Sequence, residues 1–157
     1  MALDEDVEKL KVRIELMKKC YFKGFGNLVY AVIVNCDNYL HEGREEESKR
    51  LVLQELDLVE GHYKTIPFEQ LDSNSDFAPL FVVRDLLPPF GQNTRTFLDS
   101  PKEQALKELH SQMNVIGSVG ELYCHNFQKR LGELRQIPGY EKFRVLLTDY
   151  KGCQFGM

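Results

Sequence analysis

Residues 100–139 carry the most regular pattern in the sequence, and they read SPKEQALKELHSQMNVIGSVGELYCHNFQKRLGELRQIPG. Along this stretch apolar side chains recur at alternating intervals of three and four residues, which is the repeat of one face of an α-helix. Gly120 and Arg130 interrupt the row. The pattern predicts a long helix, and the apolar members of its row are Leu106, Leu109, Met113, Ile116, Tyr123, Phe127, Leu134 and Ile137.

The two ends of this helix carry their own signals. Ser100, Pro101 and Glu103 have the spacing of a capping box, with proline at the first helical position. Pro138–Gly139 stops the pattern, because proline lacks a backbone donor and glycine readily leaves the helical conformation. The sequence therefore predicts one helix from 101 to 137.

The N-terminal region has the same spacing. From Val7 onward, an apolar row continues past residue 30, and it predicts one long helix from about 4 to 41. Gly24 and Gly26 each cost a helix about 1 kcal/mol relative to alanine, so a break at these glycines is an alternative. A short strand over Leu28–Val34 is a second alternative, because this run is rich in β-branched residues.

A second helix is predicted from 44 to 63, directly after Gly43. Its first turn is acidic, which suits the positive end of the helix dipole. Its apolar residues cover more than one face, so we expect it to pack on more than one side. The next segment, 65–76, contains a polar run of Asp, Ser and Asn and predicts the main loop, which separates two helical halves of one domain.

Two shorter helices complete the predicted secondary structure. Asp76 is placed as the N-cap of a helix over 77–87, and Pro88–Pro89 end that helix because proline disrupts helix interiors. Residues 90–94 then form a loop. A last helix is predicted over 140–150, and its inward-facing residues are Phe143, Leu146, Leu147 and Tyr150.

These elements predict an all-α fold: an elongated helical bundle with two long amphipathic helices and shorter packing helices. At 157 residues and 43% apolar content, the chain suits a single domain, 1–157, with a flexible tail over 151–157. The longest apolar run, Leu28–Val34, is far shorter than the about 20 residues of a membrane span. The acidic N-terminus does not resemble a targeting leader, so we expect a cytoplasmic or nuclear protein that stays out of membranes.

No sequence pattern predicts catalysis, a cofactor or a metal site, and we expect a protein that is not an enzyme. The four cysteines never occur as Cys-x-x-Cys, so free thiols are expected, with two disulfides as the alternative. Cys124 and His125 are adjacent, so on a helix they point about 100° apart. Gly24–Phe25–Gly26 lacks the preceding strand and the further glycine of a dinucleotide-binding loop.

The length of the apolar rows favours a protein-interaction function. Rows this long exceed what the shorter helices can cover, and an exposed apolar stripe usually binds another chain. We therefore expect a non-catalytic interaction subunit or adaptor that pairs, in the manner of a coiled coil, with a protein partner or as a homo-oligomer. The expected interface residues are Leu106, Leu109, Met113, Ile116, Tyr123, Phe127, Arg130 and Leu134.

Charge is distributed unevenly along the chain. Residues 1–78 hold 10 Lys and Arg against 16 Asp and Glu, or −6, whereas residues 79–157 hold 10 against 8, or +2. Arg130 occupies a position where the row demands an apolar side chain, and such an arginine is usually neutralised. We expect it to pair with an acidic residue, either from the N-terminal half or from another chain.

A helical nucleic-acid-associated protein is the alternative function. Its local basic groups lie beside aromatic residues that can stack on bases, although the net charge of −4 argues against a general grip on phosphate. A ligand carrier or an enzyme with a cavity in the bundle is the third possibility. The basic group consists of Lys18, Lys19, Lys23, Lys129, Arg130 and Arg135.

Overall fold

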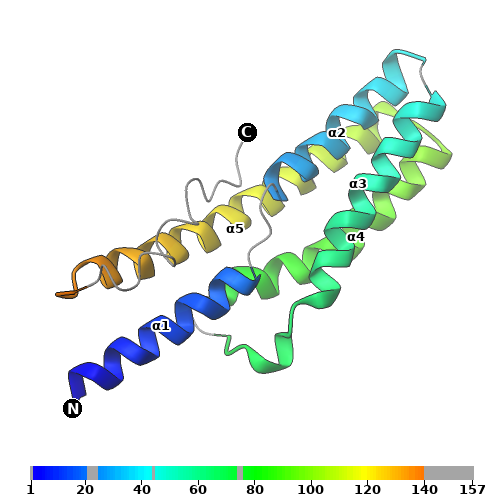
Figure 1. Cartoon of the computed structure of the whole chain (residues 1–157). Coiled ribbons are helices and arrows are strands. Elements are labelled where there is room, and N and C mark those ends of the chain that lie inside the picture. The colour runs from blue at the N-terminus through cyan, green and yellow to red at the C-terminus, as the bar shows by residue number, and fades with distance from the viewer. Residues whose placement is uncertain (1, 21–24, 44, 74–75, 140–157) are drawn as a thin grey trace.

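The computed structural model describes residues 2–20, 25–43, 45–73 and 76–139. Within this part of the chain, the regular structure is entirely helical (Figure 1). The elements are α1 (Ala2–Cys20), α2 (Phe25–His41), α3 (Glu45–Thr65), a short 3₁₀ turn η1 (Phe68–Gln70), α4 (Ala78–Asp99) and α5 (Glu103–Arg135). The predicted all-α class is confirmed.

Helices α2 to α5 pack together as an elongated bundle, and α1 lies beyond it along the C-terminal half of α5 (Figure 1). The closest pairings join α2 to α3 and α4 to α5, and α2 also packs against α5. By contrast, α3 and α4 touch over a smaller surface. We call α5 the spine of the molecule, because it packs against α2, against α4 and, along its C-terminal half, against α1.

One continuous apolar core runs along this spine. Hydrophobic burial is worth about 25 cal/mol per Å² of apolar surface, so the large side chains in the core contribute most of the stabilisation. The aromatic residues with the least exposure come from α2, α4, α5 and the residue before α4. They are Phe25, Phe77, Phe90, Phe97, Tyr123 and Phe127.

The prediction of a single helix from 4 to 41 is wrong. The described residues form two helices, α1 ending at Cys20 and α2 beginning at Phe25. Gly26 lies within α2, and residues 21–24, which include Gly24, lie outside the described residues. Phe25 and Gly26 are both buried, so α2 enters the core with its first residues. The segment Leu28–Val34 is helical, because its Val29, Val32 and Ile33 pack into the core on one face of α2.

The prediction that Pro88–Pro89 end a short helix is also wrong. The helix α4 continues through both prolines to Asp99, and it includes the predicted loop over 90–94. Both prolines are exposed, so the backbone carbonyls that lose their hydrogen bonds lie on the solvent side. Buried residues on both sides, from Leu87 to Phe90 and beyond, bind the helix to α5 and offset the loss.

Both predicted helix caps are wrong as well. The N-cap of α4 is Phe77 rather than Asp76, and no side chain caps it. The N-cap of α5 is Lys102 rather than Ser100, again without a side-chain hydrogen bond. The side chains of Asp76 and Glu103 instead form ion pairs with other helices. Both side chains thus have electrostatic partners far away in the sequence.

The remaining sequence predictions differ in outcome. The helix predicted over 44–63 corresponds to α3, and Gly139, with a φ of 80°, follows the end of α5. The helix predicted over 140–150 and the tail over 151–157 lie outside the described residues. Within the described part, no helix is long and apolar enough to cross a membrane.

The cysteines follow the prediction only in part. Cys20 and Cys36 are free thiols and buried, as expected. Cys124 is not a free thiol, and Cys153 lies outside the described residues. The expectation of free thiols therefore holds for the first two cysteines.

Candidate functional site

The structure places most of the predicted interface residues inside the chain's own core. Met113 is partly buried, and the Arg130 side chain is 26% exposed. The long row of α5 is thus covered by the other helices of the same chain, and its role toward a second chain stays a prediction. The fully buried members of the predicted interface are Leu106, Leu109, Ile116, Tyr123, Phe127 and Leu134.

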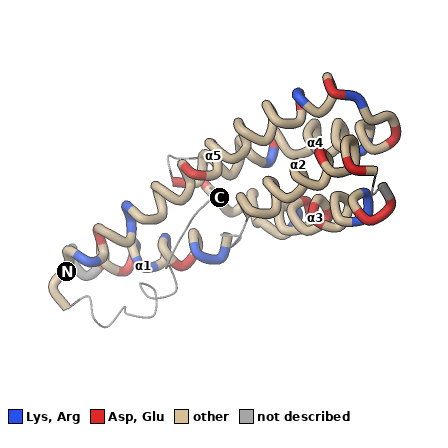
Figure 2. The backbone as a smooth tube through the Cα atoms, turned by 90° about the horizontal axis from the view of Figure 1, so that it is seen from above, with Lys and Arg blue, Asp and Glu red and all other residues tan. Residues whose placement is uncertain are grey.

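The predicted basic group does not form a single patch. Figure 2 shows Lys and Arg interspersed with Asp and Glu along the helices. Lys19, Lys129 and Arg135 are exposed, whereas Arg130 is engaged in ion pairs. Lys23 lies outside the described residues. These positions offer less phosphate-binding charge than the sequence suggested, because acidic neighbours reduce the local potential.

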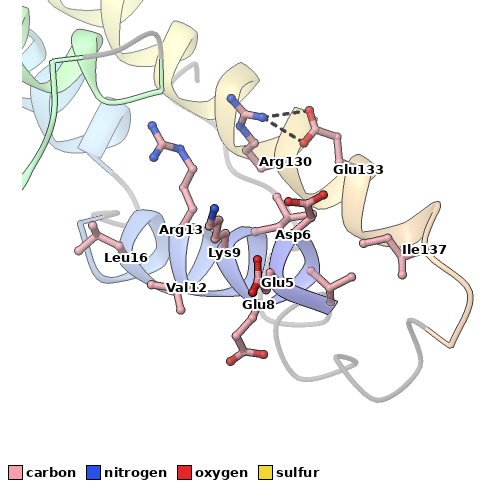
Figure 3. Close-up of a pocket in the computed structure, with 12 residues that line it drawn as sticks. Glu5, Asp6, Glu8, Lys9, Val12, Arg13, Leu16, Arg130, Glu133 and Ile137 are labelled. Carbon is pink, nitrogen blue, oxygen red and sulfur yellow. Dashed lines mark hydrogen bonds and ion pairs between the residues drawn. The ribbon is translucent and has the colours of Figure 1, made fainter. Parts of the chain in front are cut away.

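A hollow lies along α1 and the last turns of α5, where the two helices extend beyond the bundle (Figure 3). This groove has a volume of about 950 Å³. Part of it faces α5, and it also reaches the side of α1 away from α5, where Glu8 and Val12 lie (Figure 3). The apolar residues that line it are Val7, Leu10, Val12, Leu16 and Ile137.

The apolar lining results from an excess of apolar residues on α1. One row of α1 is buried, with Ile14 and Met17 fully enclosed. Val12 and Leu16 lie outside that row, and the Val12 residue is 56% exposed. The main packing partner of α1 is α5, and Leu16 is partly buried against the core, so the second apolar face of α1 exposes Val12 and part of Leu16.

A charge cluster forms the inner end of the groove and ties three segments together. Asp76, directly before α4, accepts a hydrogen bond from Arg130 Nε of α5 at 2.8 Å. It also accepts one from Arg13 of α1, and Arg130 Nη1 pairs with Glu133 Oε2 at 3.0 Å. The Asp76 side chain is only 3% exposed. The sequence prediction that Arg130 pairs with an acid from the N-terminal half is confirmed.

The charge cluster fixes the protonation state of Asp76. Burial by itself raises the pKa of this carboxyl, but the hydrogen bonds and charges of Arg13 and Arg130 outweigh burial and hold the pKa below its ordinary value. The same pairing, with its hydrogen bond to Asp76, raises the pKa of Arg130. The ion pairs of Asp76 with Arg13 and Arg130 therefore hold α1, α5 and the start of α4 together at neutral pH.

We expect Asp76 to make stability depend on acid pH. Because its folded-state pKa is depressed, its contribution is fully present above about pH 4 and is lost as the pH falls through the folded value. In urea titrations of the parent and Asp76→Asn, the difference in unfolding free energy should shrink from pH 7 to pH 3. A difference that stays constant over this range would contradict the ion pair.

Other ion pairs fasten the opposite end of the bundle. His41 of α2 pairs with Glu103 of α5, and the hydrogen bond to Glu103 raises the pKa of His41. One turn away along α2 and two turns away along α5, His110 lies 3.3 Å from Asp37. These contacts show that α2 and α5 run antiparallel. Ion pairs therefore join α2 to α5 at the end of the bundle that lies away from α1.

Neither the thiols nor the histidines that the structure describes form a reactive site. Burial raises the pKa of Cys20 to about 11 and that of Cys36 to about 12, so both thiols stay protonated at neutral pH. His62 lies 3.1 Å from the backbone oxygen of Cys20, to which its Nε2–H donates. Among the described residues no group of three or more His, Cys, Asp or Glu is placed to hold a metal ion.

A smaller hollow of about 340 Å³ lies between α3 and α4. Arg84 lies at this hollow, and its guanidinium lies over the rings of Phe68 and Phe81. Glu60, which also lines the hollow, is paired with Arg95 by two hydrogen bonds. Both Glu60 and Arg84 at this hollow therefore already have partners, and the groove along α1 is the stronger candidate site.

The fold and the groove define the class of this protein. It is an all-α bundle in which α1 packs beside the C-terminal half of α5, and a groove runs along these two helices. No family model, no curated protein and no solved structure matches the chain. Function must therefore be argued from the groove itself.

Proposed function

We propose that this protein is a non-catalytic interaction subunit that binds an amphipathic helix of another protein in the groove along α1. The observation that supports this proposal is the groove of about 950 Å³, which is lined by apolar residues of α1 and by Ile137. A helix with apolar residues at intervals of three and four fits such a surface. Binding would cover Val12 and Leu16 and remove apolar surface from water.

The charges at the groove favour a helix with a basic flank. Glu5, Asp6 and Glu8 are exposed at the outer end of α1 and line the groove. Lys9 opposes them there, whereas Arg13 and Arg130 are neutralised by Asp76. The outer end is thus acidic, and complementary charge on a partner would speed association and set its orientation.

Nucleic-acid binding has less support. The basic residues that remain exposed are interspersed with acidic ones (Figure 2), and the chain as a whole carries a charge of −4. Phosphate-driven binding also weakens steeply with salt, whereas burial of apolar surface does not. Complexes that survive a rise in salt would favour a protein partner.

The test uses a pair of matched exposed valines. Val12 lies in the groove and is 56% exposed, whereas Val115 lies on α5 outside the groove lining and is 49% exposed. A photo-cross-linking residue at Val12 should capture a partner in cells, and the same residue at Val115 should not. The captured protein is then purified and its affinity for the chain is measured directly.

With the purified partner, Val12→Glu should weaken binding at least about tenfold, because a charge enters an apolar contact, while Val115→Glu should leave it unchanged. Equal affinity of both variants would reject the groove as the binding site. If the captured protein is a second copy of this chain, light scattering should report a dimer that Val12→Glu dissociates.

A further inference from the structure

We infer that residues 140–150 of the chain itself occupy the groove along α1 when no partner is bound, and so regulate access to it. The regulatory part rests on the function proposed above.

The path of the chain leads directly into the groove. After α5 ends at Arg135, Ile137 lines the groove. Ile137 lies at the outer end of the groove, near Glu5 and Asp6 of α1 (Figure 3). Gly139 has a φ of 80°, in the left-handed region that lets a chain leave a helix and change direction. The described chain therefore ends two residues beyond a residue that lines the groove.

The lengths also agree. A helix over 140–150 would be about 16 Å long at 1.5 Å per residue, and the α1 residues that line the groove, from 5 to 16, span about 17 Å. The segment carries four apolar residues at helical spacing, so they share one face. They are Phe143, Leu146, Leu147 and Tyr150.

Charge supports the same placement and orientation. The first turns of the segment carry Glu141, Lys142 and Arg144, a net charge of +1, whereas its other end carries Asp149. A helix that enters at Ile137 and runs toward Leu16 brings this basic end beside the exposed Glu5, Asp6 and Glu8. Opposite charges at close range favour this direction over its reverse.

The segment has the features that the groove requires of a partner helix: an apolar face and a basic flank. It is also linked to the groove by two residues beyond Ile137, so its effective concentration is high. An external helix must therefore displace it. Weakening the hold of residues 140–150 should strengthen partner binding.

The first test measures hydrogen exchange by mass spectrometry on the full chain. In the parent, amides of residues 143–150 should be protected. Val12→Glu should accelerate their exchange at least about tenfold, whereas Val115→Glu should leave it unchanged. Equal exchange in the parent and both variants, or no protection in the parent, would overturn the inference.

The second test supplies the segment as a separate probe. A fluorescent peptide of residues 138–157 with Cys153→Ser is titrated into the full chain, either the parent or the double variant Phe143→Asp/Leu147→Asp. The peptide should bind the double variant at least about tenfold more tightly, because its groove is vacant. Equal affinity for both chains would contradict occupation by the chain's own segment.

The two proposals fail separately. If residues 143–150 are protected and the peptide competes as expected, yet Val12→Glu leaves partner affinity unchanged in the Phe143→Asp/Leu147→Asp background, where the segment no longer competes, the proposed function fails and the intramolecular contact stands. If Val12→Glu weakens the partner but exchange of residues 143–150 does not respond, the partner site stands and this inference fails.

Discussion

Tyr123→Asp is expected to unfold the protein. Tyr123 is 1% exposed, and its hydroxyl donates a hydrogen bond to the backbone oxygen of Met17 near the end of α1. Aspartate would leave a cavity and bury a charge, at a combined cost of at least about 5 kcal/mol. A domain is typically stable by only about 5–15 kcal/mol. The measurement is helical circular dichroism with a urea titration.

Tyr123→Phe is the matched control, since it removes only the hydroxyl. It should cost about 1–2 kcal/mol, because the ring stays in place while one hydrogen bond is lost and the Met17 oxygen loses a partner. If Tyr123→Asp keeps the parent's unfolding midpoint, Tyr123 is not in the core and the packing of α1 on α5 is wrong.

Asp76→Ala is expected to lower the unfolding free energy by about 3 kcal/mol, because it leaves two half-buried guanidinium groups without their shared carboxylate. For a domain of this size, that corresponds to a fall in melting temperature of about 10 °C. The value sits at the lower end of the range for broken buried pairs, because Arg13 and Arg130 are each about a quarter exposed.

Two substitutions of Arg130 separate the ion pair from the packing. Arg130→Leu should be close to neutral, because Asp76 keeps Arg13 and leucine continues the apolar row of α5. Arg130→Glu should be as harmful as Asp76→Ala, since it places a carboxylate beside Asp76 and Glu133. Thermal unfolding of the four proteins, parent included, makes the comparison, and a stable Arg130→Glu would show that Arg130 is merely solvated.

The candidate site was only partly visible in the sequence. Arg130 stood out because a charge interrupted an apolar row, and its pairing with the acidic half was predicted on that ground. The groove was not predicted. Val12 and Leu16 gave a weak signal, since they widen the apolar surface of α1 beyond its buried row, but nothing local indicates which face a neighbouring helix will cover.

Two glycines of α5 also could not be told apart from the sequence. Gly117 and Gly120 lie three residues apart on α5, and a glycine on a helix can let another backbone approach closely. In the structure a Cβ at Gly117 would meet nothing within 4 Å, whereas Gly120 is buried in α5. Both glycines have the same local sequence signal, and only their different surroundings distinguish them.

Local sequence patterns are enough to predict the helical class, the existence and approximate extent of α3 and α5, and the apolar row that forms the core face of α5. These features depend on periodicity and on local backbone preferences, which act over a few residues. Tertiary structure decided the passage of α4 through Pro88–Pro89 and the release of Asp76 from capping. It also decided which face of α1 stays open. In each case contacts between residues far apart in the chain outweighed a local preference of about 1–3 kcal/mol.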